Sequence, residues 1–151
     1  MHRAVSRNQA QCDRLLRELL EATAHTFKPG LQSALPEQHG VYLISTENGE
    51  ASTLLWVGRT HDSKGGLRRR VWKDHFKEPT NSSDLPRRLL REALSWSVAD
   101  AKRWISEQCK VRWIIVEDIQ VRQWLEWYAQ GVLRPVLNSA VTPPMSTWQI
   151  S

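Results

Sequence analysis

Two short runs of β-forming residues flank an Asn-Gly pair, and this arrangement constrains the fold more than any other feature of the sequence. The runs cover residues 41–44 and 54–57, and Asn48-Gly49 lies between them within the segment 47–50. Asn-Gly is favoured in tight β-hairpin turns because the turn needs positive φ angles. The sequence therefore predicts an antiparallel hairpin in the first half of the chain.

The length of the hairpin loop decides which side chains share a face of the sheet. A two-residue turn at Asn48-Gly49 would pair Tyr42 with Leu55 and place Tyr42 and Trp56 on opposite faces. A three-residue loop with Gly49 in the left-handed conformation would shift the register by one residue. Tyr42 and Trp56 would then share a face, and both registers stay open at this point.

Apolar residues at helical spacing predict helices on both sides of the hairpin, and Val111–Val116 predicts a third strand. The order of elements indicates an α+β domain, with a small three-stranded antiparallel sheet flanked by helices and an extra N-terminal helix. The expected helices are 6–27, stopped by Lys28-Pro29-Gly30; a basic helix at 67–77; one capped by Asp84 and continuing to Trp104; and one from Ile119 to about Leu133, capped by Asp118 and ended by Gly131 and Pro135.

This pattern divides the chain into three parts. Residues 1–39 form an N-terminal helical extension, residues 40–138 form the main domain, and residues 139–151 form an irregular tail containing Pro143-Pro144.

The charge balance favours a polyanionic partner. The 151 residues include 21 Lys and Arg against 16 Asp and Glu, for a net charge of +5. Arginine supplies 15 of these cations, and its planar fork binds phosphate through two contacts where lysine makes a point contact. A basic, arginine-rich domain therefore points to nucleic acid. The eight tryptophans are spread along the chain and are expected to be core and helix anchors.

Other features exclude or disfavour some classes of protein. The longest unbroken aliphatic and aromatic run, Trp113–Val116, is too short for a membrane-spanning helix, and no apolar stretch follows the N-terminal residues as in a secretory signal. The two cysteines, Cys12 and Cys109, fit a reducing compartment better than a disulfide scaffold. We therefore expect a cytoplasmic protein with no membrane partner.

Three segments resemble, in this order, the motifs of the GIY-YIG nuclease family. They are Gly40-Val41-Tyr42, then Trp56-Val57-Gly58 followed by Arg59 and Arg70, and then Glu126 followed by Asn138. The resemblance covers about two-thirds of the chain. It implies a small antiparallel sheet flanked by helices and an endonuclease that hydrolyses DNA phosphodiester bonds with one divalent metal, Mg²⁺ or Mn²⁺. Duplex or branched DNA would be the substrate.

The resemblance also implies roles for individual residues. Tyr42 would position or deprotonate the attacking water, and Arg70 would stabilise the negative charge that develops on the phosphate. Glu126 would hold the metal, which is chemically sufficient because Mg²⁺ often takes one or two protein carboxylates. Residues expected to contact nucleic acid are Arg59, Arg68, Arg69 and Asn138.

Two details depart from the family pattern. Trp56 occupies the position of the second tyrosine, and its indole is a donor only, so it cannot act as a base. A base near neutral pH could come from His75, which we expect to compensate, or from His61. The segment 60–65 also lengthens the spacing from Trp56 to Arg70, and Arg69 is the alternative catalytic arginine.

The same residues allow less specific interpretations. Glu126 could be an exposed helix residue paired with Arg122 four residues earlier, and Tyr42 a half-buried strand residue. The alternative function is a catalytically weakened or inactive GIY-YIG-like domain that binds nucleic acid or protein. The N-terminal helix could then contact a protein partner or a second copy of the chain, although its leucines could equally pack on the sheet.

Overall fold

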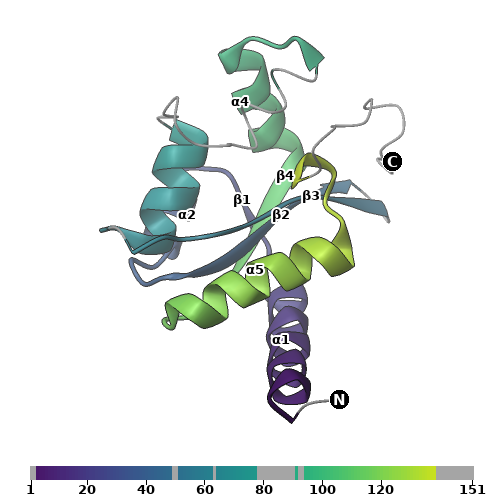
Figure 1. Ribbon diagram of the computed structural model, residues 1–151. Coiled ribbons are helices and arrows are strands. Elements are labelled where there is room, and N and C mark those ends of the chain that lie inside the picture. Colours follow the sequence, from purple (N-terminus) through teal and green to yellow (C-terminus); the bar gives the residue numbers. More distant parts are fainter. Residues whose placement is uncertain (1–2, 49–50, 63, 78–90, 92–93, 139–151) are drawn as a thin grey trace.

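The computed structural model describes residues 3–48, 51–62, 64–77, 91 and 94–138, and Figure 1 shows their arrangement. The expected helix cap at Asp84 lies outside these residues. Within the described part of the chain, no helix combines the length and apolar character needed to cross a bilayer.

An antiparallel sheet forms the centre of the fold, which is of the α+β class predicted from the sequence. Its strands are β1 (His25–Thr26), β2 (Gly40–Asn48), β3 (Ala51–Arg59) and β4 (Cys109–Ile115), in the spatial order β1-β4-β2-β3. The sheet thus has four strands where three were expected. The additional strand is β1, whose two residues pair with Val111 and Lys110 at the outer side of β4.

The N-terminal helix α1 spans Arg3–Glu21 and ends six residues before the expected end. The difference arises because His25 and Thr26 pair with β4, and the His25 ring stacks on Trp113 at 4.6 Å between centroids. Tertiary pairing therefore overrides the local preference of the segment after Glu21 for a helix.

The hairpin places Tyr42 and Trp56 on the same face of the sheet, but in neither of the registers considered above. Asn48 pairs with Ala51, and a bulge between Ile44 and Ser45 shifts the register so that Tyr42 pairs with Gly58. Such a bulge inserts one extra residue in one strand and re-aims the side chains beyond it.

Each face of the sheet buries its own cluster of apolar side chains. One cluster contains Tyr42, Ile44 and Trp56 and is covered by α2 (Gly30–Ala34), η1 (Arg68–Lys77) and α4 (Val98–Gln108). The other contains Val41, Leu43 and Val57 and is covered by α1 and α5 (Ile119–Leu133), which cross on one side of the sheet in Figure 1. Successive residues of β2 and β3 thus alternate between the clusters, except at Leu55 and Trp56, which lie at the bulge and both belong to the first cluster.

The helices after the hairpin differ from the expectation at their ends. The helix expected to continue to Trp104 is interrupted: Ser95 has a φ of 57°, and α4 begins anew after its cap Ser97. The last helix, α5, covers the expected range, and Asp118 caps it by accepting from the backbone N–H groups of Gln120 and Val121. Gly131 does not end α5, because Arg134 takes the left-handed conformation that closes it before Pro135.

Candidate active site

The candidate site is built around the phenol of Tyr42. This residue lies on β2, next to β3, which forms the edge of the sheet. The Tyr42 side chain is fully buried, and its hydroxyl hydrogen-bonds Nε2 of His75, which is also buried. Burial raises the pKa of Tyr42 to about 12, while the positive charge of Arg70 acts to lower it. The negative charge of Glu126 acts in the opposite direction. Tyr42, Arg70 and His75 therefore form one group with Trp56 beside it, and Glu126 lies near enough for its charge to act on the phenol.

Gly58 is the residue that makes room for this phenol. A Cβ atom at Gly58 would lie 2.3 Å from the Tyr42 hydroxyl and 2.9 Å from Nε1 of Trp56. Both distances are far below van der Waals contact. The glycine of the Trp-Val-Gly segment is thus required by close approach, because it lies directly opposite Tyr42 in the hairpin.

The groups around Tyr42 limit what its hydroxyl can do. Arg70 carries only N–H donors, so its interaction with Tyr42 uses a lone pair of the phenol oxygen. The neutral phenol has one proton of its own, which it can donate to Nε2 of His75. Nε1 of Trp56 is buried and forms no hydrogen bond within the described part of the chain.

The geometry of η1 explains how Arg70 and His75 reach the same phenol. This helix has the π form over Arg68–Lys77, in which each turn closes on the fifth residue. Arg70 and His75 are five residues apart and therefore lie on one face. In an α-helix the same spacing would rotate them about 140° apart. Arg70, rather than its alternative Arg69, is the arginine that interacts with Tyr42.

On the other side of β3, Arg59 and Glu126 form an ion pair. Arg59 Nε donates to Glu126 Oε1 at 3.2 Å, and each side chain is only 16% exposed. Burial raises the pKa of Glu126, and the charges of Arg59 and Arg70 oppose this shift. The alternative pairing of Glu126 with Arg122 does not occur. Arg122 is fully buried and instead binds Asp62 at 2.6 Å.

His61 faces the same group of charges from the solvent side. Its Nδ1 lies 3.2 Å from Nη1 of Arg59, and because a guanidinium can only donate, this nitrogen is an acceptor. Burial lowers the pKa of His61, and the charges of Arg59 and Arg70 lower it further. His61 is therefore a neutral imidazole at pH 7 whose accepting nitrogen is already occupied by Arg59.

Asn138 holds the edge strand beside the site. Its amide oxygen accepts from the Val57 N–H at 2.7 Å, and its amide nitrogen donates to the Val57 carbonyl at 3.1 Å. Gln130 Nε2 donates to the same carbonyl at 3.2 Å. Asn138 lies in the short helix η2 (Val136–Asn138), which packs on β3 between the positions of Trp56 and Gly58. The residue thus positions the strand that carries both side chains.

Replacing Asn138 by alanine is expected to lower the free energy of unfolding by about 2 kcal/mol, because both backbone groups of Val57 lose a partner. Urea denaturation followed by fluorescence measures the change. Gln120→Ala, at an exposed amide in the first turn of α5, is the matched control and should change stability by less than about 0.5 kcal/mol. Equal stabilities of Asn138→Ala and the unaltered protein would contradict the positioning role.

The remaining arginines expected to contact nucleic acid have other partners. Arg68 donates to the Leu35 carbonyl at 2.9 Å and pairs with Glu37 at 3.2 Å, so it fastens the segment before β2. Arg69 is exposed and its guanidinium contacts the Lys64 carbonyl at 3.5 Å. Neither is joined to the Tyr42 group by these contacts.

A divalent metal fits the site only through Glu126. Among the described residues, no group of three or more His, Cys, Asp or Glu side chains is placed to enclose a metal. Arg59 Nε donates to Oε1 of Glu126, and the backbone of Arg59 also acts on this carboxylate. A single carboxylate suits Mg²⁺, which completes its coordination with water and substrate phosphate.

Sequence reasoning missed several features of this site. The Arg59–Glu126 pair joins residues 67 positions apart, and the Asn138 clamp joins residues 81 positions apart, so no local pattern signals either. The one signal available was the five-residue spacing of Arg70 and His75, which fits a π-helix and was interpreted within an ordinary helix.

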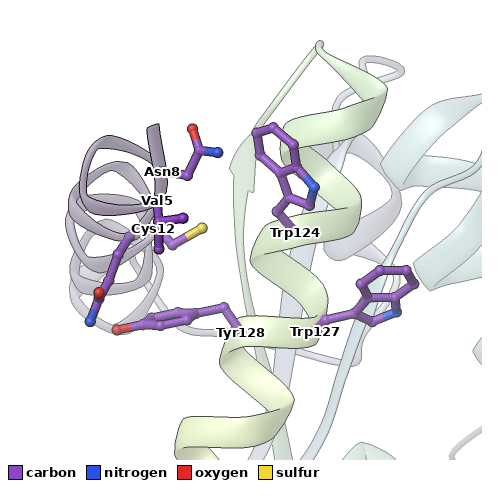
Figure 2. A pocket seen from close by; sticks show the side chains of 7 residues that line it. Val5, Asn8, Cys12, Trp124, Trp127 and Tyr128 are labelled. Carbon is purple, nitrogen blue, oxygen red and sulfur yellow. The ribbon is translucent and has the colours of Figure 1, made fainter. Parts of the chain in front are cut away.

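A hollow in the surface lies away from these residues. A hollow of about 480 Å³ runs between α1 and α5 and is lined by Val5, Asn8, Gln9, Cys12, Trp124, Trp127 and Tyr128. Figure 2 shows Tyr128 of α5 extending toward α1, with Trp124 at the upper side of the hollow and Trp127 pointing away from α1. None of these residues belongs to the Tyr42 group.

Comparison of the chain with protein-family models, with curated proteins and with solved structures finds no match.

Proposed function

We propose that this protein is a metal-dependent endonuclease that hydrolyses DNA phosphodiester bonds by a GIY-YIG-type mechanism. The observation that carries the proposal is the convergence of a phenol, a guanidinium and a carboxylate from three separate elements. The charges of Arg70 and Glu126 both act on the Tyr42 phenol, although these residues lie on η1, α5 and β2. Such a group matches a reaction in which a proton leaves water while negative charge builds up on phosphate.

Arg70 couples substrate binding to proton transfer in this proposal. It is partly exposed and in contact with the buried phenol, so it can exchange the phenol oxygen for a phosphate oxygen. When Arg70 turns to the phosphate, one lone pair of the Tyr42 oxygen becomes available to water. The phenol then accepts a proton from the attacking water and passes its own proton to Nε2 of His75, so the proton balance closes within this pair.

Phosphate binding uses the cationic side of the site. Arg70 and Arg59 stabilise the charge on the non-bridging oxygens, and the neutral His61 offers its Nε2–H as a further donor. Glu126 would hold Mg²⁺ or Mn²⁺ through its carboxylate, and such a metal would supply Lewis-acid stabilisation of the departing oxygen. Asn138 keeps β3 in place beneath these groups.

A second candidate is a domain that binds nucleic acid without cleaving it. The indole of Trp56 favours this alternative, because it is a donor only and cannot accept a proton from water. The phosphate-binding side of the site would be retained in such a domain. Nicking of supercoiled and branched DNA with Mg²⁺ or Mn²⁺ distinguishes the two functions.

Replacing Trp56 by tyrosine is expected to increase the nicking rate, because a second hydroxyl beside Tyr42 can accept a proton as well as donate one. The substitution shortens a side chain that is 9% exposed, and it should cost about 1–2 kcal/mol of stability. The measurement is the rate of conversion of supercoiled plasmid to open circles.

Trp96→Tyr is the matched control, since this partly buried indole stacks on Trp104 near α4 and not on the Tyr42 group. It should leave the nicking rate unchanged. If Trp56→Tyr nicks DNA and the unaltered protein binds DNA without nicking it, the unaltered protein has the binding-only function. Loss of an existing activity in Trp56→Tyr, with the fold intact, would contradict the proposed proton path.

A further inference from the structure

The outer face of α1 carries a stripe of arginines that the site described above does not use. Arg3, Arg7, Arg14 and Arg17 are all exposed and lie within an arc of about 80° at the helical 100° per residue. We call these four residues the arginine stripe. Over the 14 positions that it spans, α1 advances about 21 Å. The stripe is therefore a linear array of guanidinium groups along one helix face.

The arginine stripe differs from five other arginines of the described residues in its lack of ion-pair partners. Within the residues that the structure describes, none of the four forms an ion pair. The acidic residues of α1 are placed elsewhere or at one end: Asp13 accepts from the Tyr128 hydroxyl, and Glu18 and Glu21 lie near Arg14 and Arg17. In contrast, ion pairs engage Arg59, Arg68, Arg103, Arg112 and Arg122.

The opposite face of α1 fixes the orientation of the stripe. Cys12, Leu16 and Leu19 are buried, and Val5, Asn8 and Cys12 face α5 across the hollow in Figure 2. The arginines therefore point away from the domain and toward solvent. They do not belong to a loosely attached peptide, because the C-terminal half of α1 packs into the cluster beneath the sheet.

The stripe is also connected to the candidate site through α5. Asp13, near the middle of α1, bonds Tyr128, which follows the proposed metal ligand Glu126 by two residues on α5. The two helices thus cross within one turn of Glu126. The arginines lie on the face of α1 turned away from this crossing, so they would contact a polyanion at a distance from Glu126.

We propose that the arginine stripe binds the phosphate backbone of duplex DNA outside the candidate site. The charge complementarity is direct, because guanidinium groups bind phosphate bidentately and duplex DNA presents one phosphate per 3.4 Å along each strand. A length of about 21 Å corresponds to about six base pairs. This inference rests on DNA as the partner in the proposed function, but it does not require that the DNA be cleaved.

The test removes three charges from the stripe and compares the result with removal of three charges elsewhere. The stripe variant is Arg3→Gln, Arg7→Gln and Arg14→Gln, which leaves Arg17 unchanged because it lies between the buried Leu16 and Leu19, where α1 packs on the domain. The matched control is Lys28→Gln, Arg91→Gln and Arg103→Gln, at exposed positions outside α1. Both variants have the same net charge. Circular dichroism checks that their helix content equals that of the unaltered protein.

The readout is binding to a labelled 20-base-pair duplex, measured by fluorescence anisotropy between 50 and 200 mM salt. The stripe variant should bind on the order of a hundredfold more weakly near 0.1 M salt, with the slope of log K against log salt reduced by about 2–3. The control should keep the slope within about 1 of the unaltered protein. An equal loss in both variants, or no duplex binding by the unaltered protein, would overturn the inference.

Two further outcomes separate this inference from the proposed function. A protein that binds duplex through the stripe but does not nick plasmid DNA would refute the endonuclease function and support the stripe. A protein that nicks DNA with the same KM in both variants would support the endonuclease and refute the stripe. Release from phosphatidylserine vesicles in the stripe variant alone, with unchanged duplex binding, would identify a membrane contact instead and overturn the proposal.

Discussion

Glu126→Gln is expected to abolish metal-dependent cleavage, lowering the nicking rate by at least about a thousandfold while duplex binding persists. The amide keeps the size of the side chain and its oxygen can still accept from Arg59 Nε. It removes the negative charge that would hold the metal. The rate should be measured at saturating Mg²⁺ with excess protein, so that binding does not limit it.

The raised pKa of Glu126 gives this prediction a pH dependence. Burial shifts the pKa above its ordinary value of 4.5, so the folded protein holds this proton more strongly than the unfolded chain does. The free energy of unfolding therefore decreases as pH rises from 4.5 through the raised pKa and Glu126 ionises in the folded protein. Metal binding, in contrast, requires the ionised form. Cleavage by the unaltered protein should accordingly increase with pH above 4.5.

The same argument predicts that Glu126→Gln unfolds at the same or a slightly higher temperature than the unaltered protein at neutral pH. A thermal melt thus separates loss of chemistry from loss of fold. Glu107→Gln on α4 is the matched control and should nick DNA at the normal rate. If Glu126→Gln cleaves as fast as this control, the assignment of Glu126 as the metal ligand is wrong.

Gly58→Ala is expected to lower the free energy of unfolding by about 1–3 kcal/mol and to disable the site. The new methyl group would lie 2.3 Å from the Tyr42 hydroxyl, in a cluster with no space to relax without moving the phenol or the indole of Trp56. The effect is one of overlap and not of backbone strain, because positive φ angles occur at Gly65 and Gly66 but not at Gly58. Urea denaturation and the plasmid assay measure the two losses.

Gly131→Ala is the control, and its expected change in the free energy of unfolding has the opposite sign. An ideal Cβ at this position meets nothing within 4 Å, and the residue lies inside α5. Replacing a helical glycine by alanine should stabilise the protein by about 0.5–1 kcal/mol. A Gly58→Ala protein that is as stable and active as Gly131→Ala would show that the space beneath β3 is not occupied as described.

Local patterns account for much of the fold. The hairpin and α5 were recovered because their signals are contained within a few residues: β-formers on both sides of a turn for one, and a capping Asp118 for the other. The strand β1 was missed because two residues carry no periodicity, and its pairing with β4 joins segments 84 and 86 positions apart, from Thr26 to Lys110 and from His25 to Val111. The bulge at Ile44/Ser45 was missed because strand register depends on packing across both faces.

The candidate site could be proposed from the sequence as a set of residues but not as an arrangement. The motifs pointed to Tyr42, Arg70 and Glu126, and His75 was expected to compensate for Trp56; in the structure Tyr42 contacts His75 and interacts with Arg70. No spacing in the sequence could indicate that the phenol would be fully buried against these side chains from η1. Arg68 and Arg69, which were expected to contact nucleic acid, contact nearby carbonyls in the structure.

The amide of Asn138 has a consequence for self-association as well as for the position of β3. As the outermost strand, β3 presents backbone groups to which another chain could add a strand. The side-chain amide of Asn138 accepts from the Val57 N–H and donates to the Val57 carbonyl, as a neighbouring strand would. These two backbone groups are then not available to pair with another strand. Asn138, the last residue of η2, therefore also blocks intermolecular β-pairing at this point of the sheet edge.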